Sequence, residues 1–209
     1  SSGALRHGVR NGTGLAIAPD GALWTAVNNR DQVPDPRPGP SYGRVTGYVN
    51  DHPPESVARL TPGRELGWPY CNPDIDGPPA FVRDVQTNAD GSTLDCATLR
   101  PVEQTLGAHS APLGLNFYRG LAPRSIQLRR PGRGARSWNR TPPPRAPEVS
   151  FFAWYAGSLG PQQTLVGGFQ DQDGSRWGRP VAAVAGPDGA VYITDDYAGD
   201  VYRLAPPGR

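Results

Sequence analysis

A short strand-turn-strand pattern occurs twice in this chain, once near each end. Each copy is an apolar run, a Pro-Asp-Gly turn, and a second run that begins on alanine and reaches an aromatic residue; the turns are Pro19-Asp20-Gly21 and Pro187-Asp188-Gly189. Proline presets the turn, aspartate bonds back to the backbone, and glycine accepts a positive φ. A hairpin unit that recurs through a chain with 27 glycines and 25 prolines predicts an all-β, blade-based architecture.

Charge and hydrophobicity exclude two classes of partner. The 21 basic residues, all of them arginines, face 19 acidic residues, so the net charge is +2. This excess is too small to predict nucleic-acid binding. No apolar run approaches the roughly 20 residues that a membrane-spanning helix needs. We therefore expect neither nucleic acid nor a membrane span.

The pattern of turns and apolar runs predicts about three blades, fewer than the four to eight that close a propeller. We expect a hairpin over residues 12–28, a long loop over 28–54, a third strand over 55–60, and an irregular segment over 67–101. Further strands are expected over 109–118, 149–155 and 164–169, and a last blade over 179–204. The whole chain, 1–209, is then one partial β-propeller domain. An open arc of blades leaves two unpaired faces, which predicts self-association or instability.

Cys71 and Cys96 are the two cysteines of the chain. Both lie in segments rich in proline and aspartate, of the kind that form loops. Such a pair favours a disulfide, and with it an oxidising compartment, over a metal site.

In a propeller the innermost strand of each blade lines the central axis. Residues just before three such strands are candidate ligand contacts: Arg10 with Asn11, His109 with Ser110, and Arg179 after Trp177. Converging guanidinium groups suit a planar ligand with several carboxylates, because each group grips a carboxylate through two hydrogen bonds, and Trp177 offers a ring for stacking.

Each of these residues also has a structural interpretation. The arginines could tie blades together through loop carboxylates, and His109 could be a buried histidine with satisfied ring nitrogens. Asp195-Asp196, at the end of an expected strand, could bind Ca²⁺ or could simply be solvated. Residue spacing alone leaves these alternatives open.

Six short motifs in order resemble the glucose/sorbosone dehydrogenase family, closest to its sorbosone dehydrogenase-like branch. They are Gly8-Val9-Arg10-Asn11, Pro19-Asp20-Gly21-Ala22-Leu23-Trp24, Gly67-Trp68-Pro69-Tyr70-Cys71, His109-Ser110-Ala111-Pro112-Leu113-Gly114, Ser137-Trp138-Asn139-Arg140 and Trp177-Gly178-Arg179-Pro180-Val181. They span nearly the whole chain.

The resemblance implies a six-bladed propeller of which this chain is the C-terminal half. It implies binding of pyrroloquinoline quinone (PQQ), a flat tricarboxylate, with Ca²⁺, and oxidation of sugars or related polyols in the periplasm. By motif, Arg10, Asn11, Trp177 and Arg179 would contact PQQ, as would His109, Asn139 and Arg140. The backbone carbonyls of Asn29 and Arg30 would lie where the family binds Ca²⁺.

Two features depart from the family pattern. The family's catalytic histidine lies in an earlier blade, upstream of residue 1, and His7, His52 and His109 do not stand in its motif. In addition, residues 124–136 are rich in arginine, proline and glycine where the family has an apolar inner strand. We consider two explanations, a local shift of reading frame or an exposed basic loop.

The favoured function is therefore a PQQ-dependent oxidoreductase-like protein that acts on a sugar or a sugar-derived alcohol or aldehyde, periplasmic or secreted. Whether this chain is itself an active enzyme stays open at this point, as does its electron acceptor. Two alternatives keep the fold: a lactonase-like propeller hydrolase with a central metal, and a non-catalytic binding propeller or truncated remnant. A hydrolase would require acidic or asparagine side chains around the axis, whereas the expected positions offer arginine and histidine.

Overall fold

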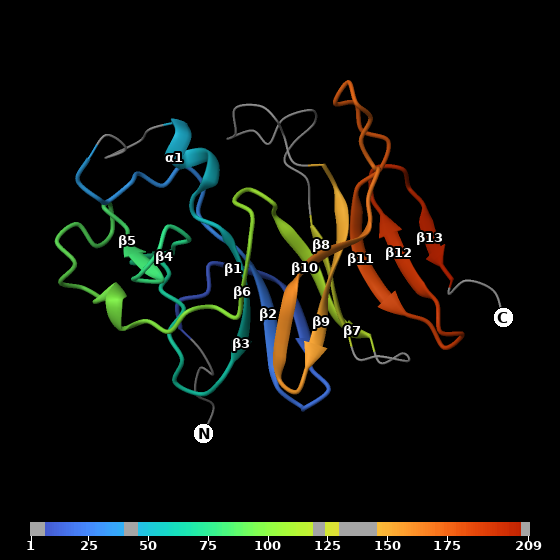
Figure 1. The fold of residues 1–209 in the computed structure, drawn as a ribbon, viewed down its shortest axis with the longest axis horizontal. Coiled ribbons are helices and arrows are strands. Elements are labelled where there is room, and N and C mark those ends of the chain that lie inside the picture. Colours follow the sequence, from blue (N-terminus) through green and yellow to red (C-terminus); the bar gives the residue numbers. More distant parts are fainter. Residues whose placement is uncertain (1–6, 40–45, 119–123, 130–145, 206–209) are drawn as a thin grey trace.

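The computed structural model describes residues 7–39, 46–118, 124–129 and 146–205, and these form three large antiparallel sheets standing side by side and one small two-stranded sheet (Figure 1). The first sheet has the order β1-β2-β3-β6, with strands Asn11–Ile17, Leu23–Asn28, Glu55–Leu60 and Gln104–Leu106. The second has the order β10-β9-β8-β7, with strands Ser158–Val166, Glu148–Tyr155, Arg124–Arg129 and Pro112–Tyr118. The third is β11-β12-β13, with strands Pro180–Ala185, Val191–Asp195 and Val201–Leu204.

In each of the three large sheets, the strand that comes first along the chain lies on the inside of the arc; these strands are β1, β7 and β11. β1 packs against β7, and β7 packs against β11, while β3 and β13 lie farther out. This is the arrangement of propeller blades around an axis, and the described sheets do not close into a ring. The prediction of an all-β partial propeller with about three blades is confirmed.

The repeated Pro-Asp-Gly turn forms the same hairpin in the first and third blades. Gly21 has φ +83° and Gly189 has φ +77°, as the turn requires of its glycine. Asp20 Oδ1 accepts a hydrogen bond from the Ala22 amide at 3.0 Å, and Asp188 Oδ1 accepts one from Ala190 at 3.2 Å. The turns join β1 to β2 and β11 to β12.

Three buried aromatic rings hold the first and second blades together. Trp24 of β2 meets Phe117 of β7 and Trp154 of β9 edge to face, with centroid separations of 6.0 and 5.8 Å, and Phe117 meets Trp154 at 5.2 Å. Such perpendicular pairs are favourable beyond the area they bury. A second core, around Phe169 and Ile193, lies where the second and third blades meet.

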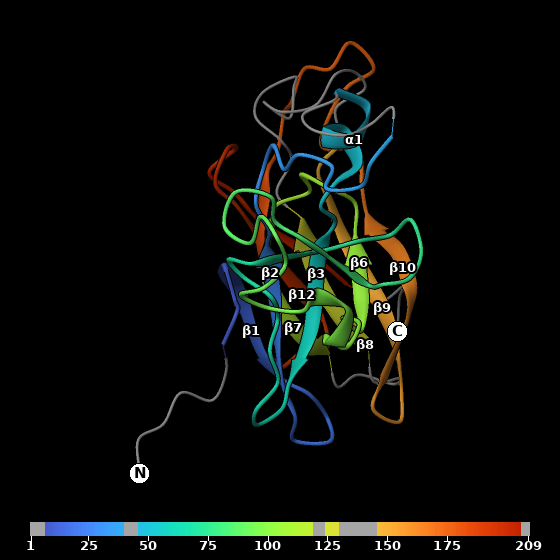
Figure 2. The same ribbon diagram turned by 90° about the vertical axis from the view of Figure 1, so that its left-hand side faces the viewer.

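Two connections differ from their sequence-based predictions. The segment over 28–54, predicted as a loop, contains a short helix, α1 (Thr46–Asp51), which lies above one end of the strands (Figure 2). Its Tyr48 and Val49 are buried, so apolar packing rather than helix propensity holds it. No helix in the described ranges is both long and apolar enough to cross a bilayer.

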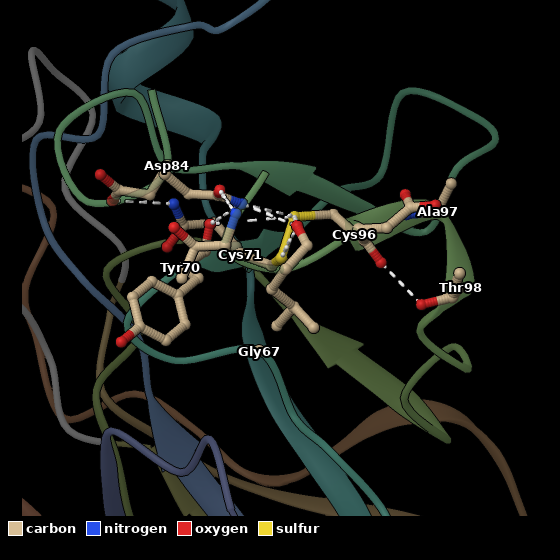
Figure 3. The surroundings of a disulfide bond; sticks show 12 residues. Gly67, Tyr70, Cys71, Asp84, Cys96, Ala97 and Thr98 are labelled. Atoms are coloured by element: carbon tan, nitrogen blue, oxygen red, sulfur yellow. Dashed lines mark hydrogen bonds between the residues drawn. A yellow bond between two sulfur atoms is a disulfide. The ribbon is translucent and has the colours of Figure 1, made fainter. Parts of the chain in front are cut away.

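The segment over 67–101, predicted as irregular, contains a small sheet of β4 (Cys71–Pro73) and β5 (Phe81–Arg83) and a 3-10 turn, η1 (Cys96–Thr98). The predicted disulfide joins Cys71 to Cys96 across it, with Cα atoms 5.7 Å apart (Figure 3). Both half-cystines are buried against Phe81. The alternative of a metal site at these two cysteines is therefore wrong.

The predicted strand over 164–169 is displaced in the structure. β10 begins six residues earlier, at Ser158, and ends at Val166. Gly167 and Gly168 follow, and Gly168 has φ +87°, a conformation incompatible with continuing a strand. The glycine pair therefore sets the end of this strand.

The arginine-rich stretch over 124–136 begins as a strand. β8 (Arg124–Arg129) pairs with both β7 and β9, so the loop interpretation is wrong for these six residues. Ile126 and Leu128 alternate with polar residues here, and this period of two suits a strand. Residues 130–136 lie outside the described ranges, and the reading-frame hypothesis stays untested.

Apolar side chains remain exposed on the first and third blades, at the two ends of the arc. Leu15 and Ile17 of β1 are each more than 60% exposed, and Val184 and Val201 on the third blade are 50% and 63% exposed. These are blade surfaces that a closed propeller would cover with a neighbouring blade.

A substitution at Gly14 tests the contact between the inner strands. A Cβ atom added there would lie 2.8 Å from Leu115 Cβ and 3.0 Å from the Leu115 nitrogen. We expect Gly14→Ala to lower the free energy of unfolding by about 1–3 kcal/mol, measured by urea denaturation. Gly47→Ala is the matched control, because nothing lies within 4 Å of an added Cβ in this helical position. Equal midpoints for Gly14→Ala and the wild type would contradict the close approach of β1 and β7.

The disulfide supports a second stability prediction. The half-cystines are separated by 25 positions in sequence, and a cross-link over a loop of this size restricts the unfolded chain. The double substitution Cys71→Ala, Cys96→Ala should lower the free energy of unfolding by about 3 kcal/mol. The variant should be insensitive to reductant, whereas the wild type should be destabilised by it. If reductant leaves the wild type unchanged, the bridge contributes nothing measurable.

Candidate functional site

The structure brings the amino-terminal ends of the three inner strands to one end of the sheets. At β1 and β7, Asn28 Nδ2 donates to the Pro112 carbonyl at 2.8 Å, and the Thr13 hydroxyl donates to the same oxygen. Between β7 and β11, Asn116 Nδ2 donates to the Ala183 carbonyl at 3.4 Å. Tyr118, at the end of β7, reaches the Gly189 carbonyl just beyond β11. The strands therefore run in the same direction, as the prediction of a shared site requires.

Arg10 precedes β1 and lies on the backbone of the neighbouring strand. Its Nη1 donates to the carbonyls of Asn28 at 3.2 Å and Asn29 at 2.7 Å. The guanidinium lies 5.6 Å from the centre of the Trp68 ring, within range of a cation–π contact. Asn11, the next residue, pairs with Asn28 in the sheet and is exposed. The remaining Arg10 donors have no partner among the described residues, so Arg10 can still bind an anion.

Arg179 precedes β11 and is already paired. Its Nε and Nη2 donate to the two carboxylate oxygens of Asp196, with Nη2 at 2.7 Å, and this pairing raises the pKa of Arg179. Asp195 is buried and accepts backbone hydrogen bonds from Arg179, Tyr197 and Ala198. The adjacent acidic pair therefore organises this turn. In the described structure, Arg179 binds a carboxylate of its own blade, whereas the structural interpretation expected the arginines to tie separate blades together.

Trp177 lies beside Arg179 with about half of its surface exposed. Its ring packs against Phe169 at a centroid separation of 5.2 Å and against Tyr202 at 6.4 Å. One part of the indole is thus fixed by the third blade, and the rest remains available for stacking against a flat ligand.

His109 precedes β7 and uses both ring nitrogens within the protein. Nδ1 lies 2.8 Å from Asp31 Oδ1, and Nε2 lies 2.6 Å from the Val49 carbonyl of α1. The ring is buried. A contact from His109 to a cofactor would have to displace one of these partners. The geometry thus agrees with the interpretation of His109 as a structural histidine.

Glu55, which the sequence analysis did not single out, is a buried carboxyl group near these residues. It accepts a hydrogen bond from the Asn29 amide. Burial raises the pKa of Glu55 to about 8, although the Asn29 hydrogen bond acts in the opposite direction. The signal in the sequence is an acidic residue directly at the start of an apolar strand, but only the fold shows that it is buried.

The two carbonyls predicted for Ca²⁺ have different surroundings. The Asn29 carbonyl accepts from Arg10, so a positive charge lies where the cation would bind. The Arg30 side chain points to Asp84, whose carboxylate oxygen is 2.5 Å from Nη1. Calcium binding at Asn29 therefore requires Arg10 to leave this carbonyl. Asn139 and Arg140, the remaining predicted cofactor contacts, lie outside the described residues.

The stability of the folded chain should fall as pH rises from 6 to 8.5. Burial alone would lower the pKa of His109, but the bonds to Asp31 and Val49 outweigh it and raise the pKa. The contribution of protonated His109 to the free energy of unfolding is fully present below about pH 6.5. It is lost as pH rises through the raised pKa. Glu55 also lowers the free energy of unfolding as pH rises, because its carboxyl group ionises at a lower pH in the unfolded chain than in the folded chain.

Urea denaturation across this pH range measures how steeply the free energy of unfolding falls with pH. Each group contributes at most about 1.4 kcal/mol per pH unit. His109→Gln should flatten the decline, and His7→Gln, at an exposed position, should leave it as in the wild type. A slope that is identical in the wild type and His109→Gln would refute the assignment.

Comparison with known proteins finds no matching family model. An uncharacterised protein of Borreliella burgdorferi is 26% identical over 204 residues, which is 96% of this chain and 48% of that protein. The chain thus spans about half the length of this curated relative.

Solved structures share the fold at low sequence identity. A Trichoderma reesei enzyme of carbohydrate-active family AA12, solved with calcium, has a TM-score of 0.70 and 19% identity over 94% of this chain and 52% of its own. The PQQ domain of Coprinopsis cinerea pyranose dehydrogenase, in its holo form, has a TM-score of 0.67 and 20% identity over 94% and 54%. The soluble aldose sugar dehydrogenase of Escherichia coli has a TM-score of 0.55 and 14% identity over 96% and 46%.

These likenesses agree with the blade arrangement described above. The chain has the fold of PQQ-dependent sugar dehydrogenase propellers and covers about half of each of these solved chains.

Proposed function

We propose that this chain supplies three blades of a PQQ-dependent oxidoreductase that acts on a sugar or a sugar-derived alcohol or aldehyde. The observation that carries the proposal is the exposed Arg10 guanidinium just before β1, at the end of the sheets where β7 and β11 also begin. The shared fold with a PQQ domain in its holo form supports the same ligand. The identity of the sugar is a matter for substrate screening.

The residues at this end of the sheets suit a flat polycarboxylate. Arg10 has donors left over after its contacts with the Asn28 and Asn29 carbonyls, and a guanidinium binds a carboxylate through two parallel hydrogen bonds. The half-exposed ring of Trp177 offers a stacking surface. Arg179 contributes only if a ligand carboxylate replaces Asp196. Bound PQQ would supply the redox chemistry, as the acceptor of a hydride from the substrate.

The proposed Ca²⁺ site has less direct support than the proposed PQQ contacts, because it requires Arg10 to move. The carbonyls of Asn29 and Arg30 would hold the ion once Arg10 turns from Asn29 towards a ligand carboxylate. The proposal thus links the two ligands, since a PQQ carboxylate would draw Arg10 away from the calcium position.

The disulfide supports a periplasmic or secreted location. Such bridges persist in oxidising compartments and are rare in reducing ones. A propeller that oxidises sugars outside the cytoplasm agrees with this location, and a small-molecule sugar is its proposed partner.

Titration of the chain with PQQ, followed by quenching of tryptophan fluorescence, tests the proposal. Arg10→Ala should weaken PQQ binding by about 10- to 100-fold, because a charge-assisted pair is lost. Arg100→Ala, at an exposed arginine between η1 and β6, is the control and should bind as the wild type does. Asp196→Asn should strengthen binding if Arg179 takes part, and should have no effect if Arg179 only ties the loop.

Dye-linked oxidation of aldoses and sorbosone then tests the reaction in the full-length parent protein with PQQ and Ca²⁺. Binding by the parent alone would show that the ligand site needs more blades than this chain has. Failure of both proteins to bind PQQ would reject the quinone proposal and favour a non-catalytic propeller.

A further inference from the structure

A second group of charged side chains lies between the connection from β2 to β3 and the loop from β4 to β5. We call it the His52 cluster: Asp35, Arg37, His52, Asp74 and Asp76. His52 follows α1, and Asp74 and Asp76 lie between β4 and β5. One ligand atom each from His52, Asp74 and Asp76 lies within 4.8 Å of the other two. Nothing in the proposed PQQ chemistry uses this cluster.

His52 presents one ring nitrogen to the carboxylates and anchors the other. Its Nδ1 lies 3.1 Å from the Tyr48 carbonyl, and its ring stacks on Tyr48 at 4.0 Å with the planes 2° apart. A proton on Nδ1 satisfies this bond and leaves a lone pair on Nε2. The residue is 5% exposed, and its Nε2 makes no hydrogen bond with the described residues. A buried nitrogen aimed at two carboxylates is thus left without a hydrogen-bond partner.

The separations fit metal ligands better than hydrogen bonds. His52 Nε2 lies 3.5 Å from Asp74 Oδ1 and 3.3 Å from Asp76 Oδ2. A charge-assisted N–H···O bond would be about 2.7–2.9 Å long. Two ligands at about 2.0–2.1 Å from one tetrahedral ion lie about 3.3–3.4 Å apart. Both distances from His52 Nε2 therefore match the spacing of two ligands around one small ion.

The charge of the His52 cluster favours a divalent cation. Arg37 faces all three carboxylates, with Nε 3.0 Å from Asp35, Nη1 3.5 Å from Asp74 and Nη2 2.7 Å from Asp76. Three carboxylates and one guanidinium leave a net charge of −2 when His52 is neutral. Asp35 and Asp74 are buried, so this charge is poorly screened by solvent. An ion of charge +2 would neutralise the cluster.

We propose that His52 Nε2, Asp74 and Asp76 bind a divalent transition metal ion such as Zn²⁺. An imidazole nitrogen with two carboxylates suits Zn²⁺, whereas Ca²⁺ prefers oxygen ligands throughout. Arg37 donates to Asp76 and the Tyr48 carbonyl faces His52 Nδ1, so these two groups orient the ligands without contacting the ion themselves. Water completes the coordination.

The ion would join two connections that are distant in sequence. His52 lies at the end of α1, and Val49 of α1 bonds His109 at the start of β7. Asp74 and Asp76 belong to the segment closed by the disulfide. Metal binding would thus clamp this segment to α1 and hold α1 against the inner end of the second blade.

Calorimetric titration of the metal-free full chain with Zn²⁺ tests the proposal. We expect one ion per chain and a higher Tm in its presence. Asp76→Asn and His52→Gln should each weaken binding at least about tenfold and abolish the rise in Tm. Asp76 is partly exposed in a loop, so its variant should fold as the wild type does, which far-UV circular dichroism checks.

Matched substitutions elsewhere complete the design. Asp90→Asn and His7→Gln change exposed residues of the same types outside the cluster and should bind Zn²⁺ as the wild type does. Co²⁺ should give visible absorption typical of tetrahedral coordination in the wild type and lose it in Asp76→Asn.

Other outcomes would overturn the proposal. They are the absence of stoichiometric Zn²⁺ binding, wild-type affinity for Zn²⁺ in Asp76→Asn and His52→Gln, or binding of Ca²⁺ in preference to Zn²⁺. In the first case the cluster is a buried ion-pair network around a protonated His52. None of these readouts depends on PQQ, so they stand apart from the test of the proposed function.

Discussion

The close approach of β1 to β7 sets how the blades are arranged and where the candidate ligand-binding residues lie. Gly14 lets the two backbones meet, because any Cβ there would collide with Leu115. The edge-to-face rings of Trp24, Phe117 and Trp154 fill the space behind this contact. Once these strands are side by side and run in the same direction, Arg10 and His109 necessarily stand at the same end of the sheets. A propeller site of this kind is a consequence of how the blades pack.

Arg10 illustrates how the same residue can serve structure and ligand binding. It holds two carbonyls at the end of β2 and rests on Trp68, yet keeps donors for an anion. Arg179 differs, since Asp196 accepts hydrogen bonds from both its Nε and its Nη2. The two arginines occupy equivalent places in their blades, but only one is available without rearrangement. They differ because the Asp196 carboxylate neutralises Arg179, whereas Arg10 contacts backbone carbonyls.

Much of the fold could be predicted from the sequence, and less of the site. The Pro-Asp-Gly turns, the strand over 55–60 and the disulfide follow from local turn chemistry, alternation and cysteine count. The helix α1 could not be predicted, because six residues carry little helical signal and burial of Tyr48 and Val49 holds them. The strand β8 was unexpected because its arginines suggested a loop, whereas pairing with β7 and β9 determines its conformation.

Local sequence is enough to predict the hairpins, the blade count and the residue types at the ends of the inner strands, because these depend on neighbours along the chain. The tertiary structure alone establishes what each of those residues contacts. It paired Arg179 with Asp196, placed His109 between Asp31 and Val49, buried Glu55, and brought His52 to Asp74 and Asp76. Most of these contacts join residues far apart in sequence. Their chemistry depends on burial and distance, which no local pattern encodes.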